Sequence, residues 1–136
     1  MGPTVNPEAM KSRTKQLAQI VIHLCRTLSH SAEARIISHQ LLRSATSVAA
    51  NYRAVCRSRS TSDFTSKLGL VLEEADETLF WLELLVAAGV VRRERINLPL
   101  DEANQLVSIF VASLRTVKGL KSGIWNLKSA IAFAPL

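Results

Sequence analysis

The chain has 136 residues, the usual size of one domain, and 48% of them are hydrophobic, so it can bury a core and is not a disordered protein. Its five Gly and four Pro are too few for the many turns of an all-β protein. The net charge of +6 permits contact with a polyanion such as nucleic acid but does not establish it.

No segment of the sequence predicts export or membrane insertion. Residues 1–15 lack the apolar run of a signal peptide, and the most apolar window, LFWLELLVAAGVV, has 13 residues and contains Glu83. Cys25 and Cys56 lie far apart in apolar helical patterns, so we expect two reduced, buried thiols rather than a disulfide. We therefore expect a cytoplasmic protein with no membrane partner.

The pattern predicts a first helix beginning near Met10, after a loose leader of residues 1–9 that contains Gly2, Pro3 and Pro7. Along this helix, apolar residues recur at intervals of three and four, the spacing of one helical face. They are Leu17, Ile20, Val21, Leu24 and Leu28.

A second helix is expected over about residues 32–57, with Ser31 as its N-cap. A third is expected over about residues 62–88, begun by Ser60 and Asp63 as in a capping box and ended by Gly89. The apolar seams of the two helices are Ile37, Leu41, Ala45, Val48, Tyr52 and Val55, and Phe64, Leu68, Val71, Ala75, Leu79, Leu82 and Val86.

A fourth helix is expected after Pro99, with Asp101 and Glu102 in its first turn. Its seam is Ala103, Leu106 or Val107, Phe110, Leu114 and Val117. After Lys121 the period is lost, so residues 122–136 are expected to form a tail. Four amphipathic helices with short connections, within residues 10–121, predict an all-α fold, an antiparallel up-down-up-down four-helix bundle.

One stretch of the second helix, LLRSATSVAANYR (residues 41–53), contains almost no large side chains. Six of the nine residues between Arg43 and Arg53 are Ala, Ser or Thr. Because helix separation depends on the side chains at the contact, we expect a close approach here, with Ser44, Thr46 and Asn51 able to hydrogen-bond across helices.

Charge is segregated along the second and third helices. Residues 34–72 contain six basic residues and one acid, whereas residues 73–83 contain five acids and no base. We expect Arg43 to form a packed, partly buried network with Glu73, Asp76 and Glu77. The alternative is a charged face in water, where each ion pair contributes little.

The sequence contains no HExxH, CxxC, nucleophile elbow or phosphate-binding Gly loop. The carboxylates Glu73, Glu74 and Glu77 raise the alternative of a metal enzyme, but no His follows any of them by three residues, as it does in di-iron bundles. We therefore expect no enzyme activity, no catalytic residue, no metal, no cofactor and no small-molecule substrate.

Residues 40–85, QLLRSATSVAANYRAVCRSRSTSDFTSKLGLVLEEADETLFWLELL, resemble the core signature of the four-helix bundle proteins encoded in intervening sequences of bacterial large-subunit rRNA genes. The segments RTKQLAQIVIHL and SIFVASLRTVK resemble the family's first and last helices, so the resemblance covers about residues 10–120. Many members carry Asn-Ile-x-Glu-Gly where this chain has NYRAV, residues 51–55, so its helix is expected to be continuous there.

The resemblance implies a ring-like homopentamer of antiparallel bundles with no known enzymatic activity. A similar bundle is the accessory variability determinant of diversity-generating retroelements, a pentamer with a basic surface that binds nucleic acid and a reverse transcriptase. In this chain, Phe80, Trp81 and Leu84 lie off the third seam and are expected to form an oligomer interface. The alternative is that they pack under the tail with Trp125.

Two functions remain open. The first is a non-enzymatic homo-oligomer that binds RNA, DNA or a nucleoprotein through basic patches near opposite ends of the bundle. The patches are Arg53, Arg57, Arg59 and Lys67, and Arg92, Arg93 and Arg95. The second is a pure protein–protein interaction scaffold in which the arginines pair with carboxylates of neighbouring subunits.

Overall fold

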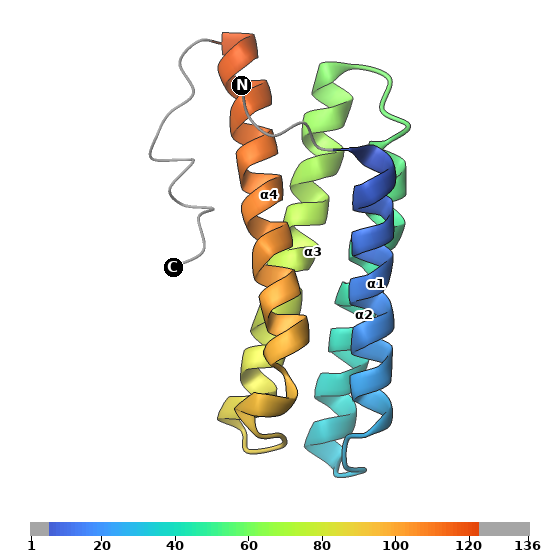
Figure 1. The fold of residues 1–136 in the computed structure, drawn as a ribbon, viewed down its shortest axis with the longest axis vertical. Coiled ribbons are helices and arrows are strands. Elements are labelled where there is room, and N and C mark those ends of the chain that lie inside the picture. The colour runs from blue at the N-terminus through green and yellow to red at the C-terminus, as the bar shows by residue number, and fades with distance from the viewer. Residues whose placement is uncertain (1–5, 123–136) are drawn as a thin grey trace.

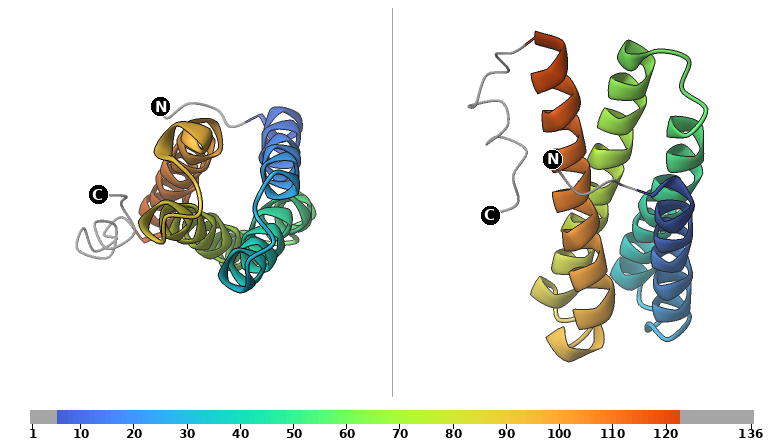
Figure 2. Two further views of the ribbon diagram at one scale, coloured as in Figure 1. Left: turned by 90° about the horizontal axis from the view of Figure 1, so that it is seen from below. Right: turned by 45° about the horizontal axis from the view of Figure 1, so that its top comes forward.

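The protein forms a bundle of four long antiparallel helices, as the computed structural model of residues 6–122 shows (Figure 1). The elements are α1 (Pro7–Arg26), α2 (Ala32–Val55), α3 (Thr61–Ala87), the short 3-10 helix η1 (Arg93–Arg95) and α4 (Asn97–Ser122). Seen end-on, each helix lies beside the one before it, and α1 and α4 lie at the open side (Figure 2). The all-α fold of four helices is confirmed, and no strand occurs within residues 6–122. The expected tail, and with it the alternative that Phe80, Trp81 and Leu84 pack under the tail with Trp125, lies outside the described residues.

The helix starts are set by local caps. The Asn6 side chain accepts hydrogen bonds from the backbone N–H groups of Glu8 and Ala9, at 3.0 and 3.4 Å, and Pro7 fills the first helical position. Helix α1 therefore begins at Pro7, about one turn before the predicted start at Met10. Pro at a first position favours a helix start rather than a loose segment, and the sequence analysis missed this.

Helix α3 begins with the predicted pair of Ser60 and Asp63, although one bond differs from a capping box. Ser60 Oγ accepts from the Asp63 N–H at 3.0 Å. The Asp63 carboxylate accepts from the backbone N–H of Arg59 at 3.1 Å, one residue earlier than a capping box requires. Ser31 caps α2 as predicted, accepting from the Ala34 N–H at 3.3 Å.

The end of α3 depends on Gly89, whose φ of +74° lies in the left-handed region. The N–H of Val90 donates to Leu85 O at 2.9 Å and that of Gly89 to Val86 O at 3.0 Å, which is a Schellman motif. After η1, α4 begins at Asn97 and not after Pro99. Proline is tolerated there because the first turn of a helix has no partner for its N–H. Asp101 and Glu102 consequently lie beyond the first turn, contrary to the prediction.

The core follows the predicted seams closely. Every seam residue of α2 is buried. Within the core, the ring of Tyr52 stacks on that of Phe110, with the ring centroids 6.0 Å apart. The seam residues Ile20, Phe64, Val86 and Val117 are half-buried. Buried positions outside the predicted seams are Met10, Thr14, Ala18, Ala34, Ser44, Leu72, Thr78, Leu85, Val91, Ile96, Pro99, Leu100 and Val111.

The small-residue stretch of α2 divides between two faces. Ser44, Ala45 and Val48 point inward and are buried, whereas Thr46 and Ala50 are exposed. Thr78 of α3 donates to Ser44 Oγ at 2.9 Å, and both side chains are fully buried, so this hydroxyl pair joins the two helices. Thr46 instead donates to carbonyls of its own helix. The expected hydrogen bond across helices is therefore made by Ser44 and not by Thr46.

Helices α1 and α4 make the sparsest contact of any adjacent pair. Arg13 of α1 spans the contact, donating to Glu102 Oε1 and Gln105 Oε1 of α4, each at 2.8 Å. Near the other end of α1, Arg95 donates to the Thr27 hydroxyl. Polar side chains thus join α1 to α4 and to η1.

Neither cysteine forms a disulfide. Cys25 is half-buried and its thiol donates to Ser38 O at 3.9 Å, whereas Cys56 is exposed at the end of α2. Burial raises the pKa of Cys25. The expectation of two buried thiols is therefore wrong for Cys56. In the described part of the chain, none of the helices is both long and apolar enough to cross a bilayer.

Candidate interaction surfaces

Arg43 lies on the outer edge of the α2–α3 contact and pairs with two carboxylates of α3. Its guanidinium donates to Glu74 Oε2 at 3.3 Å and to Glu77 Oε1, and also to Gln40 Oε1 of its own helix at 3.1 Å. The predicted network of Arg43 with acids of α3 therefore exists, but its members differ. Glu74 takes the place of Glu73 and Asp76, which are exposed and form no ion pair within the described residues.

The pKa values of the two carboxylates, Glu74 and Glu77, are shifted in opposite directions. The hydrogen bond from Arg43 is the main reason why the pKa of Glu77 lies below its ordinary value. Burial raises the pKa of Glu74 despite the attraction of Arg43. The side chain of Glu74 is 17% exposed and that of Arg43 is 42% exposed, so the network is only partly buried.

The expected oligomer interface is less exposed than predicted. Phe80 is 52% exposed, but Trp81 and Leu84 are half-buried and pack against the core. Trp81 donates from Nε1 to Glu77 Oε1 at 3.2 Å, which ties it to the Arg43 network, and its ring meets Phe80 edge to face. Of the three residues, Phe80 alone is exposed in a single copy of the chain.

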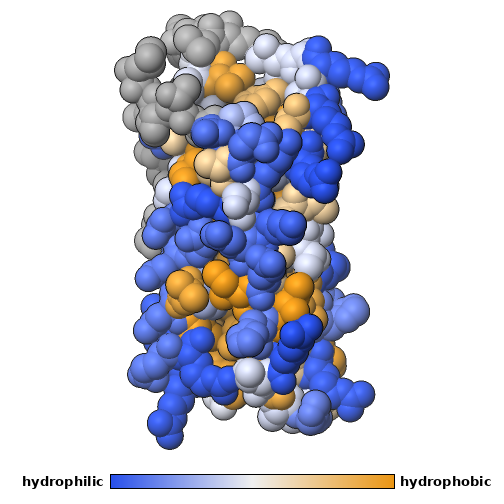
Figure 3. Space-filling model, turned by 45° about the vertical axis from the view of Figure 1, so that its right-hand side comes forward, coloured by the Kyte–Doolittle hydropathy of each residue, from blue (hydrophilic) through white to orange (hydrophobic). Residues whose placement is uncertain are grey.

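Other apolar side chains reach the surface that the sequence analysis did not single out. Figure 3 shows apolar side chains gathered in the lower half of one side of the bundle, among hydrophilic ones. Among the described residues, the large exposed hydrophobic ones are Ile36 (65% exposed), Leu70 (46%), Phe80 (52%) and Leu98 (66%). Ile36 and Leu70 lie on the two helices that carry the segregated charges, which makes α2 and α3 the candidate interaction helices.

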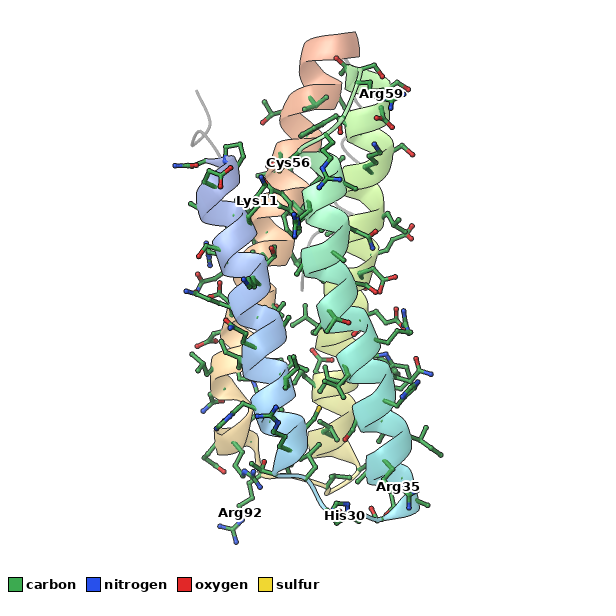
Figure 4. The ribbon with its side chains drawn as sticks, turned by 90° about the vertical axis from the view of Figure 1, so that its right-hand side faces the viewer. Lys11, His30, Arg35, Cys56, Arg59 and Arg92 are labelled. Atoms are coloured by element: carbon green, nitrogen blue, oxygen red, sulfur yellow. The ribbon has the colours of Figure 1, made fainter. Side chains whose placement is uncertain are left out.

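One end of the bundle, called here the η1 end, contains the α1–α2 loop and η1. The exposed arginines Arg92, Arg93 and Arg95 lie there, as predicted, and the structure adds Arg26 from α1 and Arg35 from α2. Figure 4 shows Arg92, His30 and Arg35 at this end. The acids of the same segments are Glu33 and Glu94, so five arginines meet two glutamates. Sequence reasoning missed Arg26 and Arg35 because they are 57 or more residues away from η1 in the chain.

The opposite end, called here the α2–α3 loop end, holds the other predicted basic patch. Arg53, Arg57 and Arg59 are exposed there and form no ion pair with a described residue. Lys67 differs, because its ammonium group lies 3.0 Å from the Asp63 carboxylate. That contact is the main cause of the lowered pKa of Asp63. Figure 4 places Arg59 at this end, far from Arg92, so the two patches are separate.

Within the described residues, no group of three or more His, Cys, Asp or Glu side chains is arranged to hold a metal ion. A cavity of about 290 Å³ opens at the α2–α3 loop end, lined by Tyr52, Cys56, Phe64, Phe110 and neighbouring residues. The thiol of Cys56 has no histidine or carboxylate among the residues that line this cavity.

The family model described as "23S rRNA-intervening sequence protein" matches residues 9–112, which include the whole segment from Gln40 to Leu85. The chain belongs to this family. The matched segment runs from the start of α1 to the middle of α4, so the family is defined by the bundle itself.

Among solved structures, the fold of this chain is similar to that of a protein from Bacteroides thetaiotaomicron. That protein is described as one with unknown function from the S23 ribosomal protein family. The two chains are 30% identical, with a TM-score of 0.71, over 77% of this chain and 97% of the other. No curated protein matches the chain.

Proposed function

We propose that this member of the family is a non-enzymatic, cytoplasmic homo-oligomer that binds nucleic acid through arginines at the ends of its bundle. The observation that carries the proposal is the η1 end, where five exposed arginines meet two glutamates. Phosphate groups bind such clusters by releasing counterions, which requires no sequence-reading element.

Oligomerisation is the second part of the proposal, with a homopentamer as the expected state. Exposed Phe80 and Ile36 support it, because large apolar side chains at a surface are typical of interfaces. In a ring, each η1 end is repeated in every subunit. Weak phosphate contacts then add as avidity, so a long nucleic acid binds far more tightly than a single copy would hold it.

The test is the salt dependence of binding to a fluorescent RNA duplex, measured by anisotropy between 50 and 200 mM salt. The variant Arg92→Glu/Arg93→Glu should weaken binding at least about tenfold and reduce the slope of log K against log salt by about two for each engaged copy. The matched control is Lys15→Glu/Arg115→Glu, which makes the same change of charge at exposed positions on the sides of the bundle. It should have a much smaller effect.

Equal loss in both variants would show that net charge, and not the η1 end, attracts the RNA. If the wild-type protein binds neither RNA nor DNA at 50 mM salt, the nucleic-acid proposal is wrong. The pure protein–protein scaffold would then be the better function. The mass of the native particle tests the oligomer separately, because it needs no nucleic acid.

A further inference from the structure

The outward sides of α2 and α3 carry opposite charges. On α2, one side contains exposed residues spaced by three, four and seven, which places them on a single helical face. This basic face consists of Arg35, His39, Thr46, Ala50 and Arg53, is extended by Arg57 in the turn just after the helix, and contains no acid. The corresponding acidic face of α3 consists of the exposed residues Glu73, Asp76, Phe80 and Glu83 and contains no base.

Neither face is neutralised inside its own bundle. The ion pairs between α2 and α3 use Arg43, Glu74 and Glu77, which lie along the edge where the two helices meet. The arginines of the basic face and the carboxylates of the acidic face form no ion pair with any residue in the described part of the chain. Each face therefore has charge available for a partner outside the bundle.

The charges of the two faces lie about one helical turn apart along the bundle. The hydrogen bond between Ser44 and Thr78 fixes the antiparallel register of α2 and α3. Counting from this pair, Glu83 is level with about residue 39, Asp76 with about residue 46 and Glu73 with about residue 49. The acids thus lie level with residues 39–49, where the basic face has no arginine, and Arg53 lies about one turn beyond Glu73 toward the α2–α3 loop. A displacement of about one turn between two copies therefore brings Glu73 level with Arg53 and Phe80 level with Thr46.

The shapes of the faces match in the same way. Thr46 and Ala50 leave the middle of the basic face shallow, whereas Phe80 projects from the acidic face with 52% of its surface exposed. With a displacement of one turn, the ring of Phe80 lies opposite Thr46 and the carboxylate of Glu73 opposite Arg53. A ring against small side chains beside a charge pair is typical of a specific protein contact. This also gives a role to the exposed small residues of α2, which the packing of α2 on α3 does not explain.

We infer that the basic face of α2 in one copy docks on the acidic face of α3 in a second copy. This inference rests on the proposed homo-oligomer and names the surfaces that build it. Because the contact joins two different faces, each added copy again presents one free face of each kind. Such head-to-tail contacts form a closed ring when the rotation between copies closes. Arg53 and Arg57 then contact a neighbouring subunit, whereas Arg26, Arg92, Arg93 and Arg95 of the η1 end remain for nucleic acid.

Charge reversal tests the contact, with native mass spectrometry and light scattering as readouts. Arg53→Glu/Arg57→Glu makes both faces acidic, and Glu73→Lys/Asp76→Lys makes both faces basic. Each variant should raise the concentration of half-assembly by about a hundredfold, since like charges then oppose each other. All substituted positions are exposed, and helix content measured by circular dichroism should be unchanged.

Rescue distinguishes this contact from a general effect of charge. The quadruple variant with all four substitutions carries an acidic α2 and a basic α3, and it should assemble again. An equimolar mixture of the two double variants should form mixed particles, in a ratio of three to two in a pentamer, because alternating copies leave only one like-charge contact in a ring of five. The control Lys15→Glu/Arg115→Glu should keep the wild-type mass.

Three outcomes overturn the inference. If either double variant keeps the wild-type mass, the interface lies elsewhere and only the proposed oligomer survives. If neither the quadruple variant nor the mixture assembles although both are folded, the two faces do not meet. If the wild-type chain is monomeric at all concentrations, the oligomer and its interface are both wrong.

Discussion

At the scale of single residues, Ser44 and Thr78 show how two hydroxyl groups set the distance between helices. Both side chains are fully buried, and both are hydrogen-bonded, which removes the cost of burying a polar group. The side chain of serine also occupies less volume than that of any branched apolar residue. Helices α2 and α3 can therefore approach closely at this level.

We predict that Ser44→Leu lowers the free energy of unfolding by about 3 kcal/mol, through overpacking and the lost hydrogen bond. Ser12→Leu, on the exposed side of α1, should change it by less than about 0.5 kcal/mol. Urea unfolding at one protein concentration measures both. Similar values for the two variants would mean that α2 and α3 are loosely packed at Ser44.

The carboxylates of Glu74 and Glu77 lead to a prediction about pH. Glu77 has a lowered pKa, so the folded protein binds its proton less readily than the unfolded chain. Its contribution is present above about pH 4.3, the ordinary value for Glu, and is lost as the pH falls through the lowered value. Glu74 has a raised pKa, so its protonation favours the folded state as the pH falls.

Removing each carboxylate should therefore change the acid response in opposite directions. Between pH 7 and pH 2.5, Glu77→Gln should lose less stability than the wild-type protein, and Glu74→Gln should lose more. The measurement is the urea midpoint of each variant at both pH values. Parallel losses in all three proteins would contradict the opposite environments described for these groups.

At the scale of helices, the ends of each element are encoded within a few residues. Ser31, Ser60 and Gly89 were recognised from sequence because the hydrogen bonds of a cap depend on local spacing alone. The starts of α1 and α4 were placed too late. In both cases a proline within the first turn was interpreted as a boundary, although proline is compatible with that position.

Gly89 and Gly69 provide a matched pair for the end of α3. Gly89 has a φ of +74°, and an added Cβ would meet no atom within 4 Å, so Gly89→Ala should cost about 1–2 kcal/mol through backbone strain alone. Gly69 lies inside α3, also with open space around it, so Gly69→Ala should stabilise the protein by about 0.5–1 kcal/mol. Thermal unfolding should show shifts of opposite sign, and equal signs would contradict the assignment of Gly89 as the terminator.

The pairing between helices was harder to predict than the helices themselves. The apolar seams follow from a repeat of three and four, which the sequence displays directly. The partners of Arg43 depend on which side of α3 faces α2. Glu77 was predicted correctly, but Glu74 takes the place of Glu73 and Asp76, which lie on the exposed side of the same helix. The burial of Thr78 was not predicted either, because a threonine in a helix carries no sequence signal of burial.

At the scale of the whole molecule, neighbouring helices of the bundle pack against each other to different extents. The α2–α3 contact is the most extensive, whereas α1 and α4 meet sparsely and are joined by Arg13, which binds Glu102 and Gln105. Local opening is easiest where few buried contacts must be broken. Helix α1 is therefore expected to separate from the bundle more readily than α2 or α3.

Hydrogen exchange should reveal this difference. Amides in the middle of α1 should exchange faster than those in the middle of α2 and α3, and Glu102→Ala should accelerate α1 about threefold to fivefold further. Glu8→Ala is the control, because it removes the more exposed Lys11–Glu8 pair within α1. Uniform protection of all four helices would show that the bundle opens as one unit.

The two thiols offer a practical way to examine the assembled particle. Because burial raises the pKa of Cys25 while Cys56 is exposed, a maleimide dye at neutral pH should react first with Cys56. Each native chain would then carry one fluorophore near the α2–α3 loop end, without any engineered cysteine. Energy transfer between such dyes would report whether neighbouring bundles stand with the same ends together or alternate head up and head down.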